Sequence, residues 1–176
     1  ASVPLGWTKM GADIDGEAEG DMSGISVSLS SDGTVVAIGA FNNDGTSSDA
    51  GHDTGHVRVY SYSGNWTQLG SDIDGEAQGD QSGIYVSLSS DGTVVAIGST
   101  DNDDTRDTAG HVRVYERNAS APLGWTQLGS DIDGEAAYDY SGYSVSLSSD
   151  GSVMAIGAHK NDDGASDAGH VRIYSW

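Results

Sequence analysis

Three copies of one unit make up this chain, and this repetition constrains its fold more than any other feature. Trp7, Trp66 and Trp125 recur at a constant interval. Each opens a block that runs through Asp-Ile-Asp-Gly-Glu-Ala and Val-Ser-Leu-Ser-Ser-Asp-Gly to His-Val-Arg. Self-similarity at a fixed period is the signature of repeat architectures, so we expect one repeat domain over 1–176. The copies span 7–60, 66–115 and 125–174, and the linkers between them span 61–65 and 116–124.

Each copy contains four segments with strand character, and none shows a sustained helical period. In the second copy these segments are Trp66–Ile73, Gly83–Ser89, Thr93–Gly98 and Gly110–Tyr115. The Asp-Gly pair at 91–92 predicts a hairpin between the second and third of them, because glycine accepts a positive φ. The pattern therefore predicts an all-β chain of three four-stranded antiparallel sheets.

The third copy contains Ser-Gly-Tyr-Ser-Val-Ser-Leu at 141–147 and Ala-Ile-Gly-Ala at 155–158. With these residues it resembles the FG-GAP repeat of integrin-α-type β-propellers, and the inner three strands also look like a WD-repeat blade. It implies propeller-type blades and extracellular recognition. Three blades are too few for an ordinary closed ring of about 4–8, so completion by another chain or by further copies is expected. A threefold β-trefoil or β-prism is the alternative fold.

A large negative charge limits the partners of this chain. Its 27 Asp and Glu residues oppose only 7 Lys and Arg, which gives a formal charge of −20. Nucleic acid and anionic membrane surfaces would be repelled. There is no apolar run long enough for membrane insertion, and the absence of cysteine excludes disulfides and thiolate zinc sites. All but four of the acidic residues fall in two connections per copy, which a blade would place on one face.

The crowded carboxylates of that face predict a cation site. Close acidic pairs repel by roughly 1 kcal/mol even in a water-like dielectric. Ca²⁺, which accepts many oxygen ligands in flexible geometry, would offset this repulsion. Solvated loops that use Asp and Asn as turn formers are the alternative. The candidate calcium ligands are Asp13, Asp15, Glu17, Asp72, Asp74, Glu76, Asp131, Asp133, Glu135, Asn102, Asp103, Asn161 and Asp162.

The calcium loop of the resembled family does not carry over to this sequence. That loop, Asp-x-Asp-x-Asp-Gly-x-x-Asp, lies in the hairpin between two inner strands. Here the hairpin reads Ser-Ser-Asp-Gly, with one carboxylate in place of several. We therefore expect Asp32, Asp91 and Asp150 to form turns.

Histidine, arginine and tryptophan recur once or more per copy. Imidazoles bind zinc or respond to pH, but these histidines recur only once per blade, as His56, His111 and His170, which favours packing between blades over shared metal coordination. The arginines two residues later are expected to pair with carboxylates of an adjacent turn; sugar or phosphate capture is the alternative. The tryptophans are expected in the core between blades, or else as ligand-stacking platforms. These residues are Arg58, Arg113, Arg172, Trp7, Trp66 and Trp125.

The strand order leaves one strand without a sheet and one sheet edge without a partner strand. The expected strand Trp7–Ile14 has no preceding sheet, and the edge His170–Tyr174 has no following strand. An open edge invites strand pairing with another chain. The chain is therefore expected to form a homo-oligomeric ring or a filament with itself, or to be part of a longer array.

Two glycosylation acceptor patterns, at Asn65 and Asn118, fall on the face opposite the acids.

These features favour a non-catalytic, extracellular or cell-surface structural or adhesive protein. No nucleophile elbow, phosphate-cradling glycine loop or zinc-protease motif is present. A carbohydrate-binding module with sites between copies is the alternative, favoured by Tyr138, Tyr140 and Tyr143, which cluster in the third copy only. A propeller hydrolase or lyase is a third reading. The expected partners are further copies of the chain, glycans or a surface protein.

Overall fold

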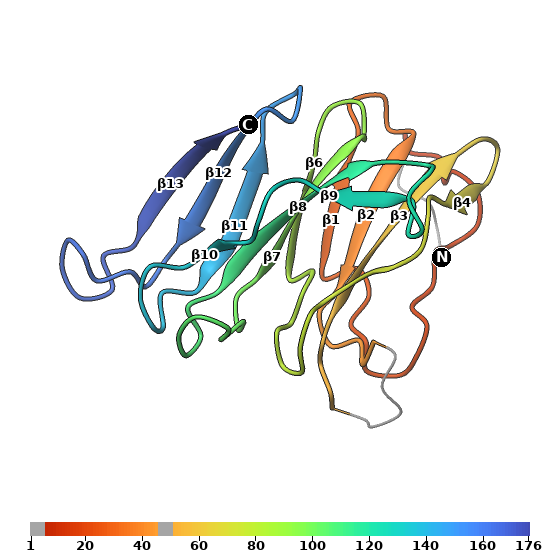
Figure 1. Ribbon diagram of the computed structural model, residues 1–176. Coiled ribbons are helices and arrows are strands. Elements are labelled where there is room, and N and C mark those ends of the chain that lie inside the picture. The colour runs from red at the N-terminus through yellow and green to blue at the C-terminus, as the bar shows by residue number, and fades with distance from the viewer. Residues whose placement is uncertain (1–5, 46–50) are drawn as a thin grey trace.

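The computed structural model describes residues 6–45 and 51–176, and all regular structure in these residues is β (Figure 1). The strands form three separate antiparallel sheets that lie side by side and do not close into a barrel. The all-β blade prediction is confirmed, and the trefoil and prism alternatives are wrong.

Blade 1 holds β1 (Ser26–Leu29), β2 (Val35–Ala40), β3 (His56–Tyr62), β4 (Trp66–Gln68) and β5 (Ile73–Asp74). Blade 2 holds β6 (Tyr85–Leu88), β7 (Val94–Ser99), β8 (His111–Arg117), β9 (Trp125–Gln127) and β10 (Ile132–Asp133). Blade 3 holds β11 (Ser141–Leu147), β12 (Val153–Ala158) and β13 (His170–Ser175).

The outer strand of each complete blade comes from the following copy. In blade 1, Trp66 pairs with Tyr62 and Ile73 pairs with Val57. The predicted continuous strand Trp66–Ile73 is wrong in one respect, because it divides into β4 and β5. Gly70 between them has a φ of 79°, which turns the chain out of the extended conformation. Blade 3 has three strands in the described residues, and its outer position is open.

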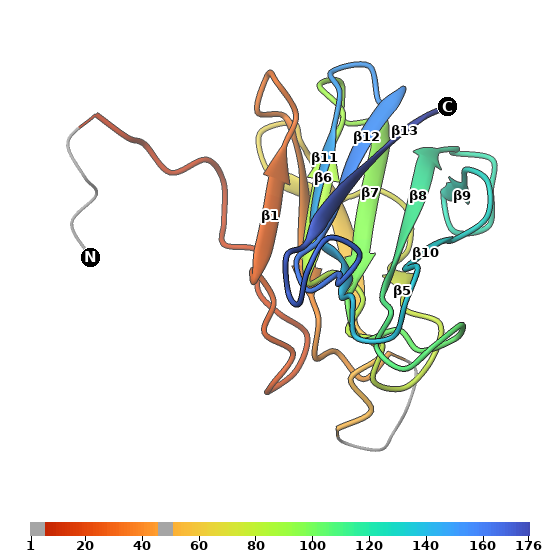
Figure 2. The same cartoon turned by 90° about the vertical axis from the view of Figure 1, so that its left-hand side faces the viewer.

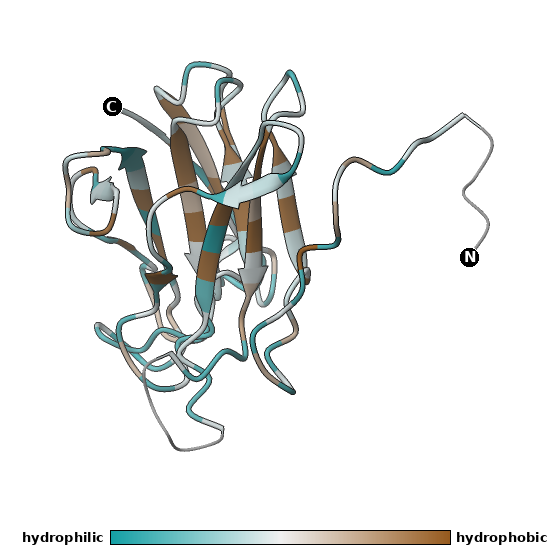
Figure 3. Cartoon of the chain, turned by 90° about the vertical axis from the view of Figure 1, so that its right-hand side faces the viewer, coloured by the Kyte–Doolittle hydropathy of each residue, from teal (hydrophilic) through white to brown (hydrophobic). Residues whose placement is uncertain are grey.

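The core lies between neighbouring blades. Blades 1 and 2 bury Val57, Val59 and Ile73 against Val86 and Ile97. Blades 2 and 3 bury a second apolar layer around Val112 and Ile156. The strands carry the apolar residues and the connections carry the polar ones, as Figure 3 shows. Each blade is therefore stabilised mainly by its neighbours.

The hairpins between the inner strands are held by their single aspartate. Asp91 Oδ1 accepts hydrogen bonds from Ser89 Oγ at 2.7 Å, from Thr93 N at 3.0 Å and from Thr93 Oγ1 at 2.8 Å. Equivalent bonds surround Asp32 and Asp150. These carboxylates are used within the turn, as expected, and the family's hairpin calcium loop does not fit here.

The segment Trp7–Ile14 is not a strand, which corrects the expectation for the first copy. The described residues contain no earlier blade that could pair with it. It nevertheless follows blade 1 in an extended form: Met10 O accepts a hydrogen bond from Trp66 Nε1 at 2.9 Å, and Ala12 N donates to Asn65 Oδ1 at 3.3 Å. Further toward the N-terminus the chain leaves the sheets beside β1 (Figure 2).

The acidic connections gather at one end of the blades. The described parts of the β2–β3, β7–β8 and β12–β13 connections lie at the lower end in Figure 1, together with the connections that follow β5 and β10. We call this the acidic end. The inner hairpins and the linkers that carry Asn65 and Asn118 lie at the opposite end. No helix able to cross a membrane occurs in the part of the chain that the structure describes.

Candidate functional site

A histidine and two carboxylates meet at each blade where its third strand begins, near the acidic end. In blade 2 the histidine is His111, the first residue of β8. Glu76 reaches it from the connection after β5, and Asp131 from the turn before β10. One ligand atom from each of the three side chains lies within 4.8 Å of the others. The corresponding clusters are Glu17, His56 and Asp72 in blade 1, and Glu135, Asp163 and His170 in blade 3.

An arginine fixes the glutamate of each cluster. In blade 2, Arg113 Nη1 lies 3.5 Å from Glu76 Oε1, and Arg113 Nη2 donates to Asp74 O at 2.8 Å. The other oxygen, Glu76 Oε2, faces His111 Nδ1 at 4.0 Å. Arg58 and Arg172 make the same contacts with Glu17 and Glu135 and with the carbonyls of Asp15 and Asp133. The glutamate is therefore held with one oxygen on arginine and one toward histidine.

In blade 2, burial favours the neutral form of His111 and raises the free-energy cost of charge on Glu76. Desolvation, followed by the nearby Arg113 guanidinium, lowers the pKa of His111 to about 4. Desolvation also raises the pKa of Glu76, with Asp131 and Asp104 adding to the effect against Arg113. A neutral imidazole therefore faces crowded negative charge, an arrangement that suits a bound cation.

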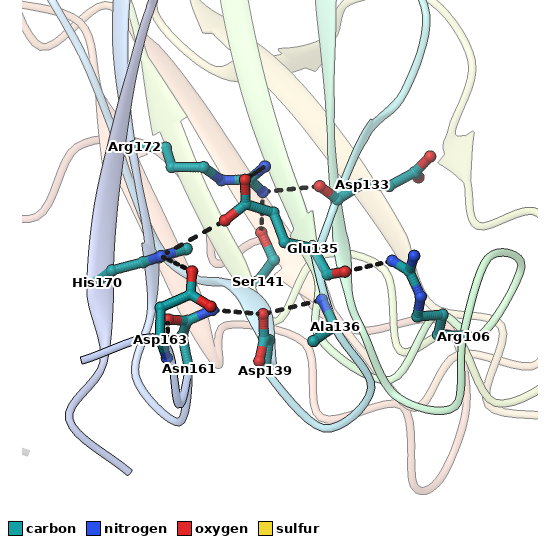
Figure 4. A network of polar contacts seen from close by, with 10 residues as sticks. All are labelled: Arg106, Asp133, Glu135, Ala136, Asp139, Ser141, Asn161, Asp163, His170 and Arg172. Carbon is teal, nitrogen blue, oxygen red and sulfur yellow. Dashed lines mark hydrogen bonds and ion pairs between the residues drawn. The ribbon is translucent and has the colours of Figure 1, made fainter. Parts of the chain in front are cut away.

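The cluster of blade 3 has a different second carboxylate (Figure 4). His170 Nδ1 lies 3.6 Å from Glu135 Oε2 and 4.0 Å from Asp163 Oδ2. Asp163 comes from the β12–β13 connection, whereas Asp72 and Asp131 come from the outer-strand segments of blades 1 and 2. The open outer position of blade 3 explains the difference, because the residue equivalent to Asp131 would belong to a further outer strand.

The structure divides the predicted calcium ligands among different environments. Asp72 and Glu76, expected in one site, lie in different clusters, with His56 and His111 respectively. Asp13 pairs instead with Lys9 at 2.7 Å on the surface. Asp103 is also exposed, and Asp162 Oδ1 accepts a hydrogen bond from Asp167 N at 2.7 Å.

The two predicted asparagine ligands are buried in the loops. Asn161 Nδ2 donates to Asp139 Oδ2 at 2.8 Å, and that carboxylate also accepts from Ala136 N at 3.1 Å. Asn102 is buried in the matching loop of blade 2. These contacts join two connections of the acidic end to each other, a role that the sequence pattern did not reveal.

The tryptophans form a second recurrent contact. Trp125 is 3% exposed, and its Nε1 donates to Leu69 O at 2.8 Å on the preceding blade. Trp66 makes the same bond to Met10 O. Trp7 has no such partner in the described residues and is 79% exposed.

A cavity marks the place where a third such contact would form. It has a volume of about 210 Å³ and lies between blades 2 and 3. Leu128 and Gly129, the counterparts of Leu69 and Gly70, line it together with Met154, Tyr174 and Trp176. Trp176 itself continues β13, since its backbone N donates to Ser152 O, and it is not the tryptophan of a further copy.

Aromatic side chains gather at the start of blade 3. The rings of Tyr143 and His159 lie 4.0 Å apart, and those of Tyr143 and Tyr85 lie 5.0 Å apart. Lys160 Nζ lies 4.9 Å above the ring of Tyr140. Of the three predicted tyrosines, Tyr140 and Tyr143 join this group through His159, and Tyr138 hydrogen-bonds Asp107 instead.

Comparisons with known proteins agree with this architecture. Residues 131–174 match the model of the FG-GAP repeat. No curated protein matches the chain. Among solved structures, Kuenenia stuttgartiensis hydrazine synthase is similar with a TM-score of 0.51 at 12% identity, over 85% of this chain and 44% of that one. The periplasmic gluconolactonase of Pseudomonas aeruginosa is similar with a TM-score of 0.52 at 17% identity, over 85% and 38%.

These likenesses concern the fold. The chain spans less than half the length of either solved structure, and both are β-propeller proteins. The matched segment 131–174 lies within the third copy, whose sequence pattern the other two copies repeat. The chain thus has a β-propeller-type fold, and its residues 131–174 match the FG-GAP repeat.

Proposed function

We propose that this chain is a non-catalytic, extracellular structural or adhesive protein that assembles with a second copy through blade complementation. One observation carries the proposal: Trp7 is exposed, and the cavity beside Leu128 and Gly129 corresponds to the place where Trp66 and Trp125 pack in the other blades, with the ring of Trp176 lying against Gly129 at its edge. The first segment of one copy would become the outer strand of blade 3 in another.

The two end faces of the array support this proposal. Val27 on blade 1 is 63% exposed, whereas its counterpart Val86 on blade 2 is 9% exposed. Val171 on blade 3 is 65% exposed, whereas its counterpart Val57 on blade 1 is fully buried. The exposed faces are thus the two halves of the interface that internal blades already form. Contiguous exposed apolar surface of this kind favours association.

The pairing within the internal blades supports one register for the exchanged strand. Trp66 pairs with Tyr62, and Ile73 pairs with Val57. By the repeat relation, Trp7 of one copy would lie opposite Trp176 of the other, and Ile14 opposite Val171. Such a heterologous contact gives a closed ring if its rotation closes and a filament if it does not.

Light scattering after size-exclusion chromatography tests the assembly. We expect a mass of at least twice the 18.1 kDa chain, and a return to the single-chain mass in Trp7→Ala. Trp7 is exposed, so its loss should leave the fold intact, which circular dichroism can verify. A wild-type chain that stays at the single-chain mass at all concentrations contradicts the proposal.

The same proposal includes Ca²⁺, which would bind the exposed carboxylates at the acidic end as their counter-ion. The crowding of Asp and Glu there supports it, because Ca²⁺ binds oxygen ligands in variable numbers. We expect Ca²⁺ to raise the midpoint of thermal unfolding relative to the EDTA-treated chain. Equal midpoints would contradict the binding of calcium.

The exposed side chains of Asn65 and Asn118 at the opposite end suit glycans on a secreted protein.

Carbohydrate binding is the second candidate function, and the aromatic group at Tyr143 and His159 favours it. Aromatic faces stack on the apolar faces of sugars, and Tyr143 is exposed. A glycan array with the wild-type chain and Tyr143→Ala tests this candidate. Binding that disappears in the variant would support it, and an array without signal would remove it.

A further inference from the structure

The cluster around His111 is the strongest unassigned feature of the molecule. His111 is fully buried, and neither ring nitrogen has a hydrogen-bond partner among the described residues. A buried polar group without a partner costs free energy, so such groups call for an explanation. His111 Nδ1 faces Glu76 Oε2 at 4.0 Å, and an Asp131 oxygen completes a group within 4.8 Å.

The 4.0 Å between His111 Nδ1 and Glu76 Oε2 is too long for a hydrogen bond and close to the separation of two ligands that share an ion. Hydrogen bonds of this kind span about 2.7–3.2 Å. Two ligands of a tetrahedral ion with bonds near 2.1 Å lie about 3.4 Å apart. Small rotations of the exposed Glu76 side chain and the half-buried Asp131 side chain would close the remaining gap.

We infer that Glu76, His111 and Asp131 form a binding site for a divalent transition-metal ion of the zinc class. Imidazole nitrogen with two carboxylates is a ligand set that suits zinc and its neighbours. Calcium takes oxygen ligands and gains nothing from a buried imidazole. The site goes beyond the proposed assembly, because all three ligands come from one chain.

Neighbouring groups complete the arrangement. Arg113 holds Glu76 Oε1 at 3.5 Å, so Oε2 remains directed at the ion position. Residues that orient a metal ligand in this way strengthen binding. Asp104 stands near the cluster and occupies the position of Asp163, which in blade 3 lies 4.0 Å from His170 Nδ1. Blade 1 has Gly45 at this position, so the blade 2 cluster has the fullest ligand set.

Titration of the metal-free full chain with Zn²⁺ tests the inference. We expect Zn²⁺ to shift the Nδ1 resonance of His111 in a nitrogen-correlated imidazole spectrum, with the signal assigned by its loss in His111→Gln. Glu76→Gln and Asp131→Asn should each weaken the Zn²⁺ affinity that this signal reports by more than about tenfold. Asp103→Asn is the matched control: it removes one charge from the same end outside the cluster, and it should leave the affinity unchanged.

Three results would overturn the inference. The His111 signal could stay in place at millimolar Zn²⁺, or both carboxylate variants could bind like the wild type. Alternatively, Ca²⁺ could produce the same shift at equal or lower concentration, which would assign the site to another ion class. If His111→Gln does not fold, the other histidine signals are assigned by His52→Gln, His56→Gln, His159→Gln and His170→Gln in turn, which leaves that of His111, and the two carboxylate variants decide. None of these readouts depends on the oligomeric state.

Discussion

The indole Nε1 of Trp125 donates a hydrogen bond of 2.8 Å to the carbonyl oxygen of Leu69, and this bond fastens the outer strand of blade 2 to that of blade 1. The ring is buried against Gly70 in the same contact. The same bond joins Trp66 to Met10, so it recurs between each of these outer strands and the equivalent segment of the preceding copy.

Replacing this tryptophan should therefore destabilise the chain strongly. Trp125→Ala removes a buried aromatic ring and its hydrogen bond, and we expect a loss of about 3–5 kcal/mol in the free energy of unfolding. Trp66 makes the same bond but is only partly buried, so Trp66→Ala should cost less. Urea denaturation of both variants measures the difference, and equal losses would contradict the interblade role of Trp125.

Much of the fold follows from the sequence through local rules. The repeat interval and the Asp91-Gly92 pair predict blades and hairpins, because turn chemistry and period-two alternation act over a few residues. The break at Gly70 was not predicted: the segment reads as one strand, and the turn becomes visible only where Ser71 N donates to Leu123 O of the next linker. Contacts between distant segments leave no local pattern.

The candidate site was less predictable for the same reason. Asp72 and Glu76 are neighbours in sequence and were expected to share one ion. They flank β5 (Ile73–Asp74), whose two ends reach different blades, so Asp72 meets His56 and Glu76 meets His111. The sequence does carry one signal of these clusters, which is the recurrence of Glu and His at equivalent positions of all three copies. That recurrence does not show that the two side chains meet, because their contact depends on how one blade packs on the next.

Glycine substitutions separate folding from assembly. An added Cβ at Gly98 would collide with the carbonyl of Gly142 on the next blade, so Gly98→Ala should lower the free energy of unfolding by at least about 2 kcal/mol. The equivalent Gly157 faces only the flexible hydroxyl of Ser144, and Gly157→Ala should stay within about 0.5 kcal/mol of the wild type. In an assembly, however, Gly24 of a second copy would lie against Gly157 of the first, as Gly142 lies against Gly98 within the chain.

Gly157→Ala should therefore block association while it leaves the monomer folded. Light scattering and thermal unfolding on the same sample give both readouts. An assembly that persists in Gly157→Ala would show that blade 3 does not receive another blade in the proposed register.

Acid should weaken the inner hairpins. Hydrogen bonds from Ser148 and from the backbone and hydroxyl of Ser152 lower the pKa of Asp150 from 3.8 to about 2. Because the folded pKa lies below the unfolded one, the carboxylate stabilises the fold fully above pH 4, and this contribution is lost as the pH falls toward 2. Asp150→Ala should reduce the loss of stability over this range, measured by urea denaturation at several pH values. Asp103→Ala, an exposed acid at the other end, should retain the wild-type slope.

An engineered disulfide tests the register of the exchanged strand. The chain lacks cysteine, and the pairing of Ser61 with Thr67 in blade 1 places Thr8 of one copy opposite Ser175 of another. Paired strands bring Cα atoms to about 4.5–5.5 Å, within the range of a disulfide. The double variant Thr8→Cys with Ser175→Cys should therefore form covalent multimers on mild oxidation, visible on a non-reducing gel. Thr8→Cys with Ser149→Cys, which puts the second thiol on an exposed hairpin, should remain single chains; equal cross-linking of both pairs would signify random collision and would contradict this register.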